Sequence, residues 1–236
     1  MKIAVLSDLH LGHGGRVDGF GHDDGEFLTF LNRLEADHER IVLAGDVWET
    51  LHSKTPGKAA RELARCRAAH PEIAARFELP HYTYLHGNHD FVAANVVAAP
   101  DMLHLNVDGT RLLFMHGHQM DWVVKNARAF SEFVVWLGGW VMRLGLSPIK
   151  RLVERFEEVL RGERADVPEE DRFQLASVAR AAELGADIVV TGHTHNAIVA
   201  EHGDRLFMNS GSCSEGVYSW LSLDTAQGRY VHQVGI

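Results

Sequence analysis

The sequence predicts an α/β fold in which sheets and helices form layers. Short runs of apolar, mostly β-branched residues recur along the chain, and the earlier ones show no alternation of apolar and polar positions. Such runs are typical of strands that are covered on both faces. Each run ends abruptly in Gly, His, Asp or Asn, and stretches with helical spacing lie between the runs. This alternation of apolar runs, turn residues and helical stretches predicts strand, loop and helix in turn.

The elements follow in order along the chain. Apolar runs predict covered strands at residues 3–6, 41–44, 82–85, 112–115 and 188–191. Helical spacing predicts helices over residues 26–36, 58–69 and 169–184, the last between Pro168 at a helix-start position and Gly185 at a helix-stop position. After residue 195 the pattern predicts an antiparallel addition to a sheet, with strands at residues 197–201, 206–209, 217–223 and 230–234.

Residues 122–164 interrupt this order and predict an inserted helical cap. The segment has no strand-like run, two helical patterns at about residues 127–144 and 148–160, and three of the five tryptophans. Eight basic and five acidic residues between Lys125 and Arg164 make it locally positive, although the net charge of the chain is −9. No Pro-, Ser- or Gly-rich linker divides the chain, so we expect residues 1–236 to form a single domain that carries this insertion.

The composition excludes several classes of protein. With 46% hydrophobic and 23% charged residues over 236 positions, the chain can bury a core, which excludes intrinsic disorder and collagen-like repeats. The acidic balance argues against broad electrostatic binding to nucleic acid or to an anionic membrane, and makes nucleic acid an unlikely partner, although a local basic patch stays open. The two cysteines, Cys66 and Cys213, lie far apart and are expected to be reduced thiols.

The same reading predicts a cytoplasmic protein. The longest apolar stretch, residues 133–142, is shorter than the about 20 residues that span a bilayer. A strand pattern begins at Lys2, which leaves no room for a signal peptide.

Polar side chains follow five of the predicted strands. In an open α/β sheet, ligands bind outside the carboxyl ends of the strands, so we expect these side chains to converge at one edge. Asp8 and His10 are two residues apart, as are His193 and His195, and this spacing places both members of a pair on one face of an extended backbone. Together the strand ends supply seven candidate metal ligands: Asp8, His10, Asp46, Asn88, His116, His193 and His195.

This donor set predicts a dinuclear metal centre. Carboxylate, amide and imidazole ligands suit divalent ions such as Mn²⁺, our first choice, with Fe²⁺ or Zn²⁺ as alternatives. Seven ligands are too many for one tetrahedral site, whereas two sites that share a carboxylate and a solvent oxygen would each be five-coordinate. Two ions, two carboxylates and a bridging hydroxide leave a charge of about +1, which would attract an anionic substrate such as a phosphate ester. Gly45, Gly87 and Gly192 are expected where the backbone turns sharply or approaches the site closely.

Five ordered motifs resemble the signature of the calcineurin-type metallophosphoesterases. They are Asp-x-His at Asp8, Gly-Asp at Asp46, Gly-Asn-His-Asp at residues 87–90, the isolated His116 and Gly-His-x-His at residues 192–195. The resemblance implies a four-layer α/β/β/α sandwich of two mixed sheets. It also implies one ion bound by Asp8, His10, Asp46 and His195, and a second bound by Asp46, Asn88, His116 and His193.

The resemblance further implies the catalytic residues. His89 would be the uncoordinated imidazole that protonates the leaving oxygen or stabilises the phosphoryl transition state, and Asp90 would be its partner. The expected reaction is hydrolysis of a phosphoester or pyrophosphate bond by in-line attack of metal-bound hydroxide.

Within the family, the sequence is similar to the UDP-2,3-diacylglucosamine hydrolase-like branch. The grounds are the Ser-Asp-Leu-His-Leu start at Ser7, the His-Gly motif at His116 followed by a helical insertion, and the Gly-His-Thr-His block. Two positions depart from that branch, which commonly has Arg in place of His89 and Asp in place of His118.

The substrate therefore has alternatives. The apolar, locally positive cap could hold the acyl chains of a lipid-linked or nucleotide substrate or make peripheral contact with a membrane, or it could roof a pocket for a soluble phosphomonoester or phosphodiester. A catalytically inactive scaffold with the same fold is the alternative of a different class.

Overall fold

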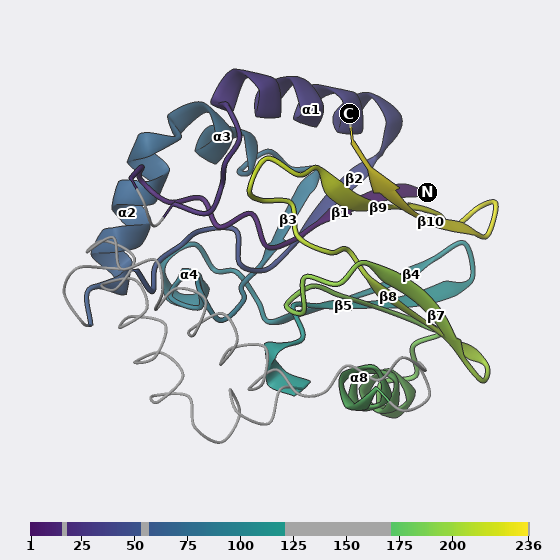
Figure 1. The fold of residues 1–236 in the computed structure, drawn as a ribbon. Helices are drawn as coiled ribbons and strands as arrows, with labels where there is room; N and C mark the ends of the chain where they lie inside the picture. Colours follow the sequence, from purple (N-terminus) through teal and green to yellow (C-terminus); the bar gives the residue numbers. More distant parts are fainter. Residues whose placement is uncertain (16–17, 53–56, 121–170, 236) are drawn as a thin grey trace.

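The computed structural model describes residues 1–15, 18–52, 57–120 and 171–235. The cap that we expect at residues 122–164 lies outside these described residues. The described chain forms two five-stranded sheets with helices on the outer face of each (Figure 1). Among the helices of the described ranges, none is both long enough and apolar enough to span a membrane.

The first sheet has the strand order β10-β9-β1-β2-β3. Its parallel half consists of β1 (Lys2–Leu6), β2 (Arg40–Ala44) and β3 (Tyr82–Leu85). The strands β9 (Ser219–Asp224) and β10 (Arg229–Val234) extend it in the antiparallel sense beside β1. The last two strands of the chain therefore complete the sheet that the first strand begins.

The second sheet has the order β4-β5-β6-β8-β7. Here β5 (Thr110–Met115), β6 (Ile188–Thr191) and β8 (Arg205–Asn209) are parallel, and β7 (Ile198–His202) pairs with β8 in the antiparallel sense. These strands were predicted to within two residues, and the same holds for the first sheet.

The strand β4 (Met102–Val107) was not predicted. It pairs with β5 in the antiparallel sense, and Val107 and Thr110 face each other across an Asp108-Gly109 turn. Because Asp-Gly between two strand patterns is a strong signal for a hairpin, this strand was detectable in the sequence.

The helices cover the outer faces of the sheets (Figure 1). On the first sheet lie α1 (Asp24–Asp37), α2 (Ala59–Ala69) and the short α3 (Pro71–Arg76). On the second sheet lies α8 (Arg172–Glu183), and α4 (Ala93–Val96) and the 3-10 helix η1 (His118–Met120) are single turns near the strand ends. The expected helices at residues 26–36, 58–69 and 169–184 correspond to α1, α2 and α8, whereas α3, α4 and η1 were not predicted.

The start of α8 differs from the expected position for a local reason. The Asp171 carboxylate accepts hydrogen bonds from the amides of Phe173 and Gln174, so Asp171 is the N-cap and the helix begins at Arg172.

Alternate residues of each strand enter different layers of core. In β1, Ile3 and Val5 pack between the sheets, whereas Ala4 and Leu6 pack beneath the helices of the first sheet. Both faces of the strand are buried, which is why its sequence shows no alternation. The result is the expected four-layer α/β/β/α sandwich of two mixed sheets.

Candidate metal centre

The seven candidate ligands come together where five strands end. Asp8 and His10 follow β1, Asp46 follows β2 and Asn88 follows β3, all from the first sheet. His116 follows β5, and His193 and His195 follow β6, from the second sheet. The carboxyl ends of parallel strands in both sheets therefore meet at one edge of the sandwich.

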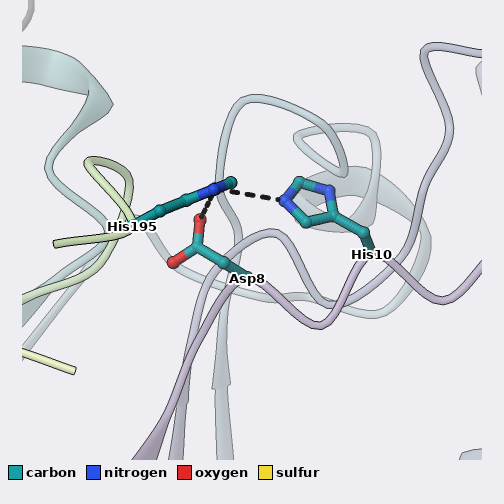
Figure 2. Close-up of side chains that lie close together, drawn as sticks. All are labelled: Asp8, His10 and His195. Atoms are coloured by element: carbon teal, nitrogen blue, oxygen red, sulfur yellow. Dashed lines mark hydrogen bonds and ion pairs between the residues drawn. The ribbon is translucent and has the colours of Figure 1, made fainter. Parts of the chain in front are cut away.

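Three of the ligands form one group at this edge. Asp8 Oδ1 lies 3.1 Å from His195 Nε2, and His10 Nε2 lies 3.4 Å from the same nitrogen. Figure 2 shows the Asp8 carboxylate and the His10 ring both directed to the same edge of the His195 ring. Asp8 is wholly buried, whereas the His195 side chain is 32% exposed, so the group is open on one side.

The second group is built around His116. Its Nε2 lies 3.2 Å from Asp46 Oδ2 and 3.2 Å from Asn88 Oδ1. Its Nδ1 lies 2.9 Å from the carbonyl oxygen of Ala44, which fixes the proton on Nδ1 and leaves Nε2 as the ligating atom. The His193 ring completes this side, with its centroid 5.2 Å from that of His116.

The two groups adjoin each other. One ligand atom each from Asp8, Asp46 and His116 lies within 4.8 Å of the others, so Asp8 and Asp46 stand side by side between the groups. The structure thus brings all seven sequence-predicted ligands to one place.

The backbone at the ligands has an uncommon conformation. Five of the seven have a left-handed backbone with positive φ: Asp8, His10, Asp46, His193 and His195. Outside glycine this conformation is found at a few per cent of residues, and it is concentrated at functional sites. It lets the chain reverse directly after each strand, so that the side chain projects from the sheet edge.

The three motif glycines leave room for the ligands, as predicted. A Cβ on Gly45 would lie 2.5 Å from His116 Cγ, and one on Gly87 would lie 2.8 Å from Asp46 Cγ. A Cβ on Gly192 would lie 2.7 Å from Asp8 Oδ2. Any side chain at these positions would overlap the candidate ligands.

The donor atoms fit divalent metal ions. Two ligand atoms that each lie about 2.1 Å from one ion are about 3.0–3.4 Å apart, and the O···N distances of 3.1 Å at Asp8 and 3.2 Å at Asp46 match this. Asp8 Oδ1 is buried, and apart from its ion-pair contact with His195 it has no hydrogen-bond partner within the described part of the chain, which leaves a lone pair for a cation. Imidazole and carboxylate in this proportion suit Mn²⁺, Fe²⁺ or Zn²⁺.

The charges at the site agree with cation binding. Burial alone would raise the pKa values of Asp8 and Asp46, but the positive charges of His195 and His116 around them outweigh burial and hold both pKa values well below the ordinary range. Burial would likewise lower the pKa of His116, yet the carboxylates of Asp46 and Asp8 raise it to about 9. Both carboxylates are thus ionised, and a bound cation would replace the proton on His116.

His89 lies beside the first group but has a different partner from the expected one. Its ring stands edge-on to His10, with the centroids 4.7 Å apart, and its backbone N–H donates to Asp46 Oδ1 over 2.8 Å. Its Nδ1 lies 2.7 Å from Glu49 Oε2.

The expected pairing of Asp90 with the His89 imidazole is therefore wrong. Asp90 is wholly buried and accepts hydrogen bonds from the amides of Val47, Trp48 and Gly87 and from the Tyr84 hydroxyl. These bonds join the loops after β2 and β3. Through these hydrogen bonds the Asp90 carboxyl supports the two loops, and burial and the neighbouring charge of Asp46 raise its pKa.

Glu49 is a further carboxylate at the site, and it was not predicted from the sequence. Its Oε2 faces three imidazoles: His89 Nδ1 at 2.7 Å, His10 Nδ1 at 3.4 Å and His52 Nδ1 at 3.6 Å. Its Oε1 accepts from the amides of Leu51 and His52. Burial would raise the pKa of Glu49, but the charges of His52 and His89 hold it well below the ordinary value. The available signal was its position in the loop three residues after Asp46.

Comparison with known proteins gives a family and several similar folds. A family model described as calcineurin-like phosphoesterase matches residues 1–197. Vps29 of Entamoeba histolytica complexed with Zn²⁺ is 17% identical with a TM-score of 0.49, and the match covers 100% of this chain and 98% of that one. An archaeal phosphodiesterase is 17% identical with a TM-score of 0.47, over 99% of each chain.

A conserved uncharacterised protein of Streptococcus pneumoniae, a predicted phosphoesterase, is 16% identical with a TM-score of 0.43, over 99% of this chain and 97% of that one. A search of curated protein sequences gives no significant match.

Proposed function

Because the chain belongs to the calcineurin-like phosphoesterase family, we propose that it is a dinuclear metal-dependent phosphoesterase that hydrolyses a phosphoester or pyrophosphate bond. The observation that carries this proposal is the meeting of two His/Asp groups at Asp8 and Asp46, with ligand atoms within 4.8 Å of one another. One ion would be held by Asp8, His10, Asp46 and His195, and the other by Asp46, Asn88, His116 and His193. We propose Mn²⁺ as the first metal to test, then Fe²⁺ and Zn²⁺.

Divalent ions in such a site activate water and neutralise the charge of a phosphoryl group. The chain itself positions the ligands. Asp46 Oδ1 accepts from the His89 amide, which leaves Oδ2 toward His116, so one hydrogen bond orients the carboxylate that would be shared. Asn88 and His89 are neighbours in the chain, so the same short loop supplies a ligand and an imidazole.

We assign to His89 the transfer of a proton to the leaving oxygen. Glu49 accepts a hydrogen bond from Nδ1, so a protonated His89 presents its second N–H, on Nε2, away from Glu49. The carboxylate also stabilises the positive charge of the imidazolium. Glu49 would thus favour the protonated imidazole and fix its orientation, as a proton donor requires.

For the substrate, we propose a lipid-linked or nucleotide phosphoester of the kind handled by the UDP-2,3-diacylglucosamine hydrolase-like branch. The support is the motif set around Ser7, His116 and His193, together with the locally positive sequence at residues 122–164. We also propose that this segment makes peripheral contact with a membrane. A soluble phosphomonoester or phosphodiester is the alternative substrate. We propose a cytoplasmic location on the ground that Cys66 and Cys213 are buried free thiols.

The test of the function combines turnover with metal analysis. Purified protein with added Mn²⁺ should hydrolyse bis(p-nitrophenyl) phosphate or p-nitrophenyl phosphate. Asp46→Ala should lose both metal binding and turnover, whereas His89→Ala should keep its metal and lose about 10²–10⁴-fold in rate, the usual scale for a positioned proton donor. Unchanged turnover of His89→Ala, or its failure to bind metal, would refute this division of roles.

The substrate needs a second experiment. A metal-supplemented screen of phosphomonoesters, phosphodiesters and UDP-sugar lipids, with and without detergent, should show the highest kcat/KM for a lipid-linked substrate. Activity confined to water-soluble esters would remove the lipid assignment. No hydrolysis of any ester under metal supplementation would favour a scaffold that keeps only the fold.

A further inference from the structure

Two buried serines from different sheets meet behind Asp8. Ser7 is the residue after β1, and Ser210 is the residue after β8. Both are 0% exposed, and their hydroxyl oxygens lie 2.7 Å apart. Ser7 Oγ also makes a short hydrogen bond to Asp8 Oδ2. A chain of hydroxyls therefore runs from the second sheet to a candidate metal ligand in the first.

The direction of these hydrogen bonds follows from the charge on Asp8. An ionised carboxylate can only accept, so the single hydrogen of the Ser7 hydroxyl points to Asp8 Oδ2. Ser7 Oγ must then accept from Ser210. The other acceptors in reach, the carbonyl of Gly211 at 3.1 Å from Ser7 and that of Thr191 at 3.4 Å from Ser210, are more distant. Ser210 thus donates to Ser7, and Ser7 donates to Asp8.

The two oxygens of Asp8 are divided by this arrangement. Oδ2 accepts from Ser7 and, over 3.1 Å, from the backbone N–H of His193, whereas Oδ1 lies 3.1 Å from His195 Nε2. The space beside this pair is closed, because a Cβ on Gly192 would lie 2.7 Å from both Ser7 Cβ and Asp8 Oδ2. The carboxylate therefore has one oxygen occupied by the protein and one directed into the first group of ligands.

We propose that Ser7 and Ser210 are positioning residues that hold Asp8 with Oδ1 toward the cation it shares with His10 and His195. This inference rests on the proposed function, since it requires a cation there. Ser210 lies beyond residue 197, where the family match ends, so the C-terminal strands would contribute to the metal centre as well as to the sheets.

The test measures metal binding directly. Isothermal titration of the metal-free full chain with Mn²⁺ gives an affinity for each of two ions. Ser7→Ala should weaken one of them by about 10- to 100-fold, the usual effect of losing a partner that orients a metal ligand, and leave the other within about twofold. Ser210→Ala should weaken the same ion by a smaller factor. The double variant should match Ser7→Ala, because Ser210 acts only through Ser7.

Ser219→Ala is the matched control. Ser219 is also a buried hydroxyl that contacts Ser210, but it donates to the Ser210 carbonyl over 2.7 Å and lies outside the hydroxyl chain. It should lower the melting temperature and leave both Mn²⁺ affinities unchanged. If Ser7→Ala does not fold, Ser210→Ala still decides the question.

The outcomes separate this proposal from the proposed function. If the wild type binds two ions and folded Ser7→Ala and Ser210→Ala bind both as tightly, the serine proposal is overturned and the phosphoesterase proposal stands. If the wild type binds a single ion, the dinuclear function fails, and weakening of that ion by Ser7→Ala still supports the role of the serines. A wild type that binds no divalent ion overturns both.

Discussion

Glu49→Gln is the most informative single change at the site, because it removes a charge and keeps the shape. Gln can keep its Oε1 toward the amides of Leu51 and His52. Its NH₂ group then takes the place of Oε2, 2.7 Å from His89 Nδ1. Since a donor now faces this nitrogen, Nδ1 must become an acceptor, and a charged imidazolium loses its anionic partner.

The expected fall in kcat follows from the lost contact between Glu49 and the His89 imidazolium. A hydrogen bond to a charged group contributes about 1.5–3 kcal/mol. At about 1.36 kcal/mol per tenfold change in rate, the loss predicts a fall in kcat between about 10-fold and about 150-fold. This is less than the loss of about 10²–10⁴-fold expected for His89→Ala, because the imidazole itself remains.

The assay is steady-state hydrolysis of bis(p-nitrophenyl) phosphate at saturating Mn²⁺, with the metal content of each variant measured because His10 also faces Glu49 over 3.4 Å. The matched control is Glu62→Gln. Glu62 is equally buried and lies 2.9 Å from His13 Nε2, but it contacts none of the candidate ligands in the described part of the chain, so turnover should not change.

A double-mutant cycle decides between positioning of His89 and a general effect on the site. In the His89→Ala background, Glu49→Gln should have almost no further effect on kcat. If Glu49→Gln lowered kcat by the same factor in both backgrounds, or kept full activity, Glu49 would not act by positioning His89.

Three further predictions concern the framework of the site. Gly87→Ala should fold but bind about one ion fewer by metal analysis, since its Cβ would lie 2.6 Å from the Asp46 amide nitrogen; full metal content would contradict the close packing. Asp90→Asn should lower the free energy of unfolding in urea by about 1.5–3 kcal/mol, because an amide group replaces an oxygen that accepts from buried backbone N–H groups; an unchanged unfolding midpoint would show that these bonds contribute nothing. Removal of metal with EDTA should lower the melting temperature. Mn²⁺ at 100 times its Kd should then raise the free energy of unfolding by about 2.7 kcal/mol for each ion bound. A melting temperature that does not respond to Mn²⁺ would argue against a built metal site.

The sequence predicted those strands and helices that show a local pattern of apolar and polar residues. Both-face burial makes a strand such as β1 a continuous apolar run, and the polar residues that follow it are then placed at the sheet edge by topology alone. Their positions directly after predicted strands could therefore identify Asp8, Asp46 and His116 as neighbours in space, although they are far apart in the chain.

Side-chain pairing was not predictable in the same way. The resemblance implied Asp90, the next residue in the chain, as the partner of His89, whereas Glu49 is 40 residues away. The loop after β2 turns at Asp46, which has a φ of 51°, and in this loop Glu49 Oε2 lies 2.7 Å from His89 Nδ1. A left-handed backbone at a non-glycine residue has no clear mark in the sequence, so the pairing it creates could not be derived from spacing.

The carboxylates at the site also explain why its motifs occur together. Three of them accept a backbone N–H from a different motif: Asp8 from His193, Asp46 from His89, and Asp90 from Val47. In these three cases a carboxylate of one loop satisfies a backbone amide of another loop. The left-handed residues cost about 1 kcal/mol or more each, and these shared hydrogen bonds offset that cost only when all the loops are in place. The metal ligands are therefore positioned by one another's backbones, and losing one carboxylate should disturb a ligand in a second motif as well as its own.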